Sequence, residues 1–114
     1  MRLIEMNNHE RSLLLYLETC AVDYGGSVDL NHINSADLEI LGRWDAAGFV
    51  RSGRIAFHDV EEMRKRCHGR RRAALWADLS EEAWELAHAE RRERAERLMV
   101  KREWRRAGED EAHG

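Results

Sequence analysis

The strongest chemical signal in this sequence is a cluster of basic residues at positions 64 to 72. The segment reads RKRCHGRRR and contains six basic side chains and no acidic one: Arg64, Lys65, Arg66, Arg70, Arg71 and Arg72. Residues 1 to 63 hold 5 basic and 11 acidic side chains, and residues 73 to 114 hold 8 basic and 11 acidic ones. The cluster is therefore a concentrated positive spot on an acidic chain, and it suits an anionic partner. The simplest alternative is a solvated basic loop that has no partner.

Catalytic and metal-binding patterns are not found in the sequence. The six histidines fall in no metal-ligand spacing, and the adjacent pair Cys67 and His68 is poorly arranged for chelation. The chain has no glycine-rich phosphate loop and no nucleophile motif with a plausible partner. We therefore expect no enzymatic activity, no catalytic residue, no metal and no cofactor. Cys20 and Cys67 show no disulfide pattern and no segment approaches the ~20 apolar residues that cross a bilayer, which favours a reducing cytoplasm.

The composition predicts one mainly helical domain. The chain has 114 residues, of which 43% are hydrophobic and 36% charged, and it contains no proline. We expect a single domain over residues 1 to 107, mainly α with a small antiparallel β wing and a long C-terminal helix. Residues 108 to 114 are expected to form a disordered acidic tail.

Two helices are predicted before position 50. The first begins at Asn8, carries an apolar face at three- and four-residue spacing, and ends at Gly25 and Gly26. A short strand is expected over residues 28 to 30. Asn34 or Ser35 caps the second helix, and Gly48 stops it, with Phe49 packing back over its end. The expected apolar side of this helix consists of Leu38, Ile40, Leu41, Trp44 and Ala47.

A β wing is predicted to follow the second helix. Residues 49 to 51 and 54 to 57 flank Ser52 and Gly53, a pair suited to a two-residue hairpin turn. A short helix is expected from Asp59 to near Gly69. Residues 73 to 79 alternate like a strand, with Leu75, Ala77 and Leu79 on one face and Trp76 on the other.

The last helix is expected to begin at the Ser80 cap and to continue to about Arg106. Residues 88 to 97 contain no large apolar side chain, so these turns are predicted to face water, with Glu90 paired to Arg94 and Glu93 to Arg97. Leu98, Met99, Val100 and Trp104 then form an apolar island, which either folds back on the first helix or meets another protomer.

The order of these elements resembles winged helix-turn-helix domains, especially small bacterial and phage regulators of the MarR-like kind. The resemblance covers residues 10 to about 100 and is carried by the junction from Trp44 to Phe57 and by LSEEAWELA at the start of the last helix. It implies a DNA-binding regulator that dimerises through its first and last helices. Only three residues separate Leu30 from the Asn34 cap, so the supporting helix is missing or reduced to one turn.

Two functions are compatible with these patterns. In the first, the basic wing binds double-stranded DNA through the six basic residues of the cluster, with Arg43, Arg51 and Arg54 as secondary contacts. In the second, a winged helix body recognises a protein, as a phage or mobile-element inhibitor of a host factor would. The residues predicted for a partner or dimer interface are Glu39, Gly42, Ala46, Leu98, Met99 and Trp104. A homodimer is compatible with both functions.

Overall fold

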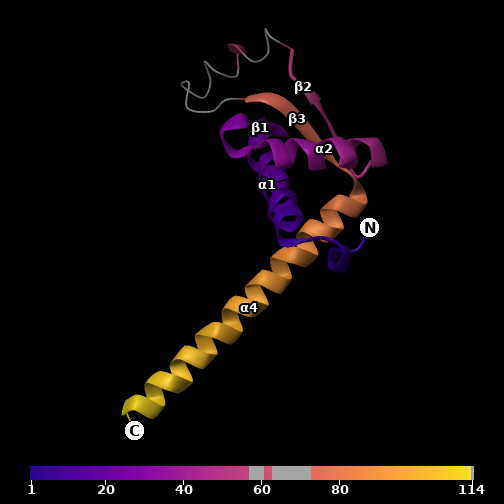
Figure 1. Cartoon of the computed structure of the whole chain (residues 1–114). Helices are drawn as coiled ribbons and strands as arrows, with labels where there is room; N and C mark the ends of the chain where they lie inside the picture. Colours follow the sequence, from indigo (N-terminus) through magenta and orange to yellow (C-terminus); the bar gives the residue numbers. More distant parts are fainter. Residues whose placement is uncertain (57–60, 63–72, 114) are drawn as a thin grey trace.

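The protein is mainly helical, with a small three-stranded antiparallel sheet and a long C-terminal helix (Figure 1). The computed structural model describes residues 1–56, 61–62 and 73–113. Its elements, in chain order, are η1 (Leu3–Glu5), α1 (Asn8–Tyr24), β1 (Ser27–Asp29), η2 (Leu30–His32), α2 (Ser35–Ala47), β2 (Val50–Arg54), β3 (Ala73–Leu79) and α4 (Glu81–His113). At this level the predicted fold class is confirmed.

The central strand of the sheet is β3. The strand order is β1-β3-β2, and β3 is antiparallel to both neighbours. The predicted short strand near Val28 is confirmed as β1, although Leu30 belongs to η2, and Val28 lies opposite Leu75 of β3. The predicted alternation of β3 is also confirmed, because Ala77 and Leu79 are buried whereas Trp76 is 41% exposed.

The predicted hairpin turn at Ser52 and Gly53 is wrong. Both residues lie within β2, where Ser52 is opposite Ala77 and Gly53 is opposite Trp76. The glycine provides room for the indole ring, because a Cβ atom on Gly53 would lie 2.8 Å from Cζ2 of Trp76. A close approach across strands therefore explains the glycine that suggested a turn. The helix predicted from Asp59 to Gly69 lies outside the described residues, apart from Glu61 and Glu62.

The ends of α1 and α2 are set by local hydrogen bonds, as predicted. The side chain of Asn34 accepts a hydrogen bond from the backbone N–H of Asp37 at 2.9 Å, which caps the start of α2. Gly48 ends α2 in the left-handed conformation with φ 72°, which glycine adopts without a Cβ penalty. The backbone N–H of Phe49 then donates to the carbonyl of Trp44 at 3.0 Å, so the chain turns tightly into β2.

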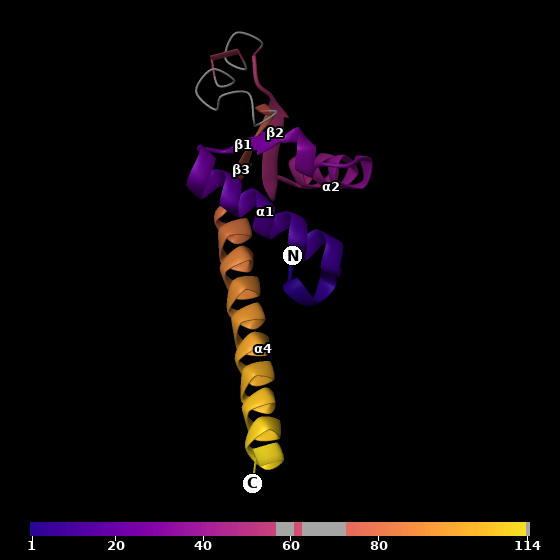
Figure 2. The ribbon, with the colours of Figure 1, turned by 90° about the vertical axis from the view of Figure 1, so that its left-hand side faces the viewer.

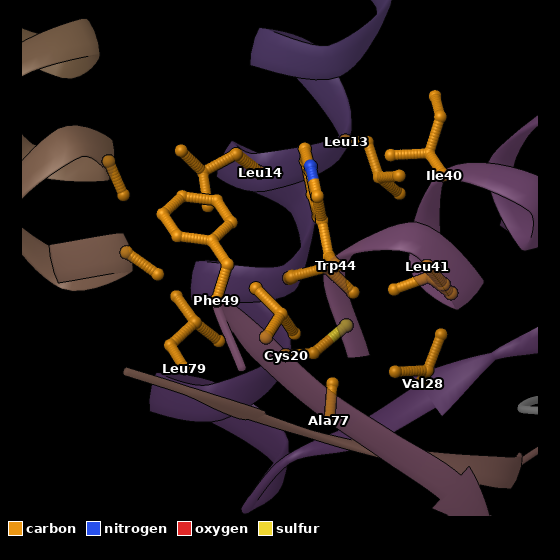
Figure 3. Packing of buried hydrophobic residues seen from close by; sticks show 14 of the residues in the cluster. Leu13, Leu14, Cys20, Val28, Ile40, Leu41, Trp44, Phe49, Ala77 and Leu79 are labelled. Atoms are coloured by element: carbon orange, nitrogen blue, oxygen red, sulfur yellow. The ribbon is translucent and has the colours of Figure 1, made fainter. Parts of the chain in front are cut away.

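The hydrophobic core lies where α1 and α2 pack on the inner face of the sheet (Figure 3). Trp44 is nearly inaccessible, and its ring meets Phe49 edge to face at a centroid distance of 5.3 Å. Two predicted core positions of α2 are wrong, because Leu38 is 48% exposed and Ala47 is also exposed. Asp37 is buried instead of Leu38, since its carboxylate contacts His9 of α1.

The C-terminal helix α4 is longer than predicted. It continues through residues 108–113 to His113, so the expected end near Arg106 is wrong and these residues are helical. Gly108 lowers helix propensity by only ~1 kcal/mol, and the residues that follow it include good helix formers. The first turns of α4 pack against the domain, and the rest project from it, which gives a molecule of 65 × 35 × 24 Å (Figure 2). Among the described helices, none is long and apolar enough to span a membrane.

Candidate nucleic-acid interface and the contacts that position it

The basic cluster from Arg64 to Arg72 lies outside the described residues, but the chain on both sides of it is described. The backbone N–H of Ile55 donates to the carbonyl of Ala74 at 2.9 Å, and Arg54 lies opposite Leu75 across the two strands. The segment that carries the cluster therefore leaves and re-enters the fold at neighbouring positions of β2 and β3. Six positive charges are thus attached to one end of the sheet.

The exposed face of α2 brings four of the predicted residues together. Glu39, Gly42, Arg43 and Ala46 are all exposed and share the face that points away from the core. A Cβ atom on Gly42 would meet nothing within 4 Å, so internal packing does not require a glycine there. One cation and one carboxylate lie on this face, which leaves little net attraction for phosphate groups.

Arg51 and Arg54 lie on β2, and Arg51 is close to Asp45 near the end of α2. The Oδ1 atom of Asp45 accepts a hydrogen bond from the backbone N–H of Ser52 at 3.1 Å and lies 3.4 Å from Nε of Arg51. Asp45 therefore fixes α2 to β2 and offsets part of the charge of Arg51. Arg54 is exposed at the end of β2, where the chain leaves the sheet. The sequence analysis did not predict this positioning role of Asp45.

The sequence analysis also missed the residues that form a polar contact between α1 and α4. Glu90 is 1% exposed, and its carboxylate accepts hydrogen bonds from Arg11 at 3.0 Å, Arg94 at 2.7 Å and Arg97 at 3.3 Å. Arg11 also donates to Glu93 at 3.2 Å. The Glu90–Arg94 pair was predicted, but the prediction that these turns face water is wrong at Glu90, because α1 covers it.

The electrostatics of Glu90 follow from this arrangement. Burial alone raises the pKa of its carboxyl group, but the hydrogen bonds and charges of Arg94 and Arg11 outweigh burial and hold the pKa below its usual value of 4.5. Glu90 is therefore ionised at neutral pH. Its hydrogen bond from Arg11 ties the first half of α4 to α1, whereas Arg94 and Arg97 bind its other oxygen from within α4.

A further ion pair joins the two helices at Glu18, two turns after Arg11 in α1. Arg91 of α4 pairs with the buried carboxylate of Glu18 in α1 and donates to the hydroxyl of Thr19 at 3.0 Å. His88 Nε2 lies 3.5 Å from the second oxygen of Glu18. Arg94 donates to the Ser12 hydroxyl at 3.2 Å. These contacts fix the direction in which α4 leaves the domain, so they have a structural role.

A small cavity of about 270 Å³ lies between α1, η2 and α2, lined by His9, Ser12, Leu13, Tyr16, His32 and Asp37. Its most polar feature is the pair formed by His9 Nε2 and Asp37 Oδ1, which are 2.6 Å apart. The other oxygen of Asp37 accepts from the backbone N–H of Asn34 at 3.0 Å. Both oxygens of Asp37 are thus occupied: one by the contact that joins α1 to α2, and the other by the capping box at the start of α2. Among the described residues, no three His, Cys, Asp or Glu side chains are placed to hold a metal ion.

The described part of the chain leaves the apolar island near the end of α4 uncovered. Leu98, Met99 and Val100 are each more than half exposed, and Trp104 is 78% exposed. The alternative in which this island folds back on α1 is therefore wrong, because the polar contacts of Glu90 and Glu18 hold α1 against earlier turns of α4. The alternative of a second protomer stays a prediction.

No protein-family model, curated protein or solved structure matches this chain.

Proposed function

We propose that this chain is a non-enzymatic, winged helix-like DNA-binding protein that contacts DNA mainly through its basic segment. The observation that carries the proposal is the placement of six basic and no acidic residues, over positions 64 to 72, between two adjacent strands. In this assignment β2 and β3 form the two sides of the wing, α2 takes the place of the recognition helix, and the single turn η2 replaces the supporting helix. A cytoplasmic location belongs to the same proposal, on the basis of the cysteine pattern.

The described surface supports contacts with the phosphate backbone rather than recognition of bases. Arg43 is the one cation on the exposed face of α2, and Glu39 on the same face repels phosphate. Arg51 is partly neutralised by Asp45, which leaves Arg54 as the cation nearest the start of the basic segment. Binding of this kind is dominated by release of counterions, so it is sensitive to salt and tolerant of DNA sequence.

The test is duplex DNA binding by the intact protein and by the variant Arg70→Ala, Arg71→Ala, Arg72→Ala. A charge-matched control removes three arginines from the exposed end of α4 instead, through Arg102→Ala, Arg105→Ala and Arg106→Ala. We expect the first variant to bind at least about tenfold more weakly than the intact protein at moderate salt, because three phosphate contacts are lost. The control should keep most of the affinity. Equal weakening of both variants would show that net charge, rather than this segment, determines binding.

The second candidate function is recognition of a protein partner by the exposed face of α2, as in a phage or mobile-element modulator of a host factor. The observation that favours it is Gly42, which lowers helix propensity by ~1 kcal/mol although the fold leaves open space beside it. A glycine and the nearby Ala46 would let a partner backbone approach α2 closely. Absence of duplex binding by the intact protein at low salt would favour this candidate over the first.

A further inference from the structure

The outer face of the sheet carries an exposed tryptophan, Trp76, on the central strand. Ala77 and Leu79 of β3 point into the core (Figure 3), so the side chain of Trp76 points to the opposite face of the sheet. Trp76 is 41% exposed although β3 has a neighbour on each side. Part of the indole ring is therefore available to a partner that approaches the sheet from outside.

The residues opposite Trp76 on the two neighbouring strands are small. Ser27 of β1 and Gly53 of β2 are its partners in the sheet register. The indole lies against the backbone of Gly53, because a Cβ atom there would be 2.8 Å from Cζ2 and 2.9 Å from both Cε2 and Nε1 of the ring. The glycine thus fixes the position of the indole, and in this row of the described strands no bulky side chain competes with a second planar ring.

The two ends of this face differ in charge. Arg54 is exposed at the end of β2, and the basic segment rejoins the sheet at Ala73. Ala73 is three residues before Trp76, which is roughly 10 Å along an extended strand. At the other end, Asp78 lies opposite Arg51, so a negative and a positive charge are neighbours there. Positive charge is therefore concentrated on the side of the tryptophan where the basic segment is attached.

We propose that Trp76 stacks on an unpaired base, and that the preferred partner is DNA with a single-stranded stretch. Arg54 and the basic segment bind the phosphates on one side of that base. Every base has a π face, so the contact tolerates any sequence. In an uninterrupted duplex the neighbouring base pairs cover these faces, and Trp76 has no base to stack on. The inference rests on the proposed function, because both use the phosphate contacts of the basic segment, and it adds that the DNA is unpaired.

The first experiment uses the intact protein and two oligonucleotides of equal length at one moderate salt concentration. One is single-stranded oligothymidine, and the other is an abasic strand that keeps the phosphates and lacks the bases. We expect the strand with bases to bind about 5- to 150-fold more tightly, which is the range for one stacked base. Equal affinity for the two strands would overturn the inference, and this result does not depend on the folding of a variant.

The second experiment assigns the preference to one indole ring. Trp76→Ala is compared with Trp104→Ala, a control that removes an indole that is 78% exposed on α4, and circular dichroism checks that both variants fold. We expect Trp76→Ala to bind the two strands with equal affinity and Trp104→Ala to keep the preference of the intact protein. Trp76→Phe should keep part of it, because a phenyl ring still stacks. A preference that survives in Trp76→Ala, or that falls equally in Trp104→Ala, would contradict the assignment.

The salt dependence separates this inference from the proposed function. Trp76→Ala removes no charge, so it should leave the slope of log K against log salt concentration unchanged. The variant Arg70→Ala, Arg71→Ala, Arg72→Ala should reduce the slope and keep the preference for the strand with bases. Salt-sensitive binding without that preference would contradict only the stacking contact. A preference for bases with a slope that the three arginine substitutions do not change would contradict only the role of the basic segment.

Discussion

Replacing Glu90 with alanine should loosen the attachment of α4 to the domain. Glu90 is 1% exposed and accepts hydrogen bonds from Arg11, Arg94 and Arg97 at 2.7 to 3.3 Å. Removal of one partner from a buried ion pair costs roughly 3–5 kcal/mol, because the remaining charge is left in a poorly hydrated site. Here Arg94 and Arg97 are 41% and 60% exposed and regain water, so we expect the lower part of the scale.

The expected loss in the free energy of unfolding is about 3 kcal/mol. For a chain of this length, such a loss lowers the melting temperature by about 10 °C. Urea unfolding followed by far-ultraviolet circular dichroism measures the free energy, and thermal unfolding provides the second value. Both measurements use the full chain at neutral pH, where the carboxyl group of Glu90 is ionised.

Glu93→Ala is the matched control, because Glu93 is one turn from Glu90 and contacts the same Arg11 at 3.2 Å. Its side chain is 51% exposed, so its ion pair is screened by solvent and should contribute less than about 1 kcal/mol. Equal, small effects of Glu90→Ala and Glu93→Ala would refute the reasoning, since burial of Glu90 by α1 is what separates the two residues.

Three further predictions concern stability. The stabilisation from Glu90 should be present above pH 4.5 and be lost as the pH falls below that value, because its pKa is lower in the folded state than in the unfolded one; Glu90→Gln should flatten this part of the pH–stability curve. Gly53→Ala should lower the free energy of unfolding by about 1–3 kcal/mol, because its Cβ atom would lie 2.8 Å from the Trp76 ring; the cost should largely disappear in a Trp76→Ala background, and persistence there would contradict the steric explanation. Gly42→Ala should raise the free energy of unfolding by about 0.5–1 kcal/mol in chemical denaturation, since alanine favours the helix and the site is open; a loss of stability would show a packing role for the glycine.

The parts of the fold that the sequence predicted correctly depend on residues that are close together in the sequence. Asn34 caps α2 with a residue three positions away, and Gly48 stops the helix through its own backbone conformation. The alternation of β3 was also readable, because buried Ala77 and Leu79 flank an exposed position. Each of these features is fixed by a few consecutive residues, so it needs no knowledge of the tertiary structure.

The wrong predictions involve partners that are distant in the sequence. Ser52 and Gly53 are residue types that are common in tight turns. In the structure, Gly53 instead provides room for the ring of Trp76 on the neighbouring strand. Glu90 lies in a charged stretch that suggests solvent exposure, and the arginine that covers it, Arg11, is 79 residues away. Leu38 was assigned to the core because of its spacing. In the structure, the contact between Asp37 and His9 turns the side of α2 that carries Asp37 toward α1, and Leu38 is exposed.

For the candidate site, the sequence predicted which residues carry the positive charge but not where they are attached to the fold. The basic residues at positions 64 to 72 are evident without a structure, and β2 and β3 add where the segment is attached. The exposure of the apolar island near the end of α4 required the structure, because the sequence does not show which turns of α4 remain uncovered by α1.

The claim that the basic segment holds DNA is tested most directly by the slope of log K against log salt concentration for a duplex. Neutralisation of six phosphates predicts a slope of about −5 for the intact protein, and loss of Arg70, Arg71 and Arg72 should reduce its magnitude to about 3. A slope near zero for the intact protein, or the same slope after the three substitutions, would contradict the account.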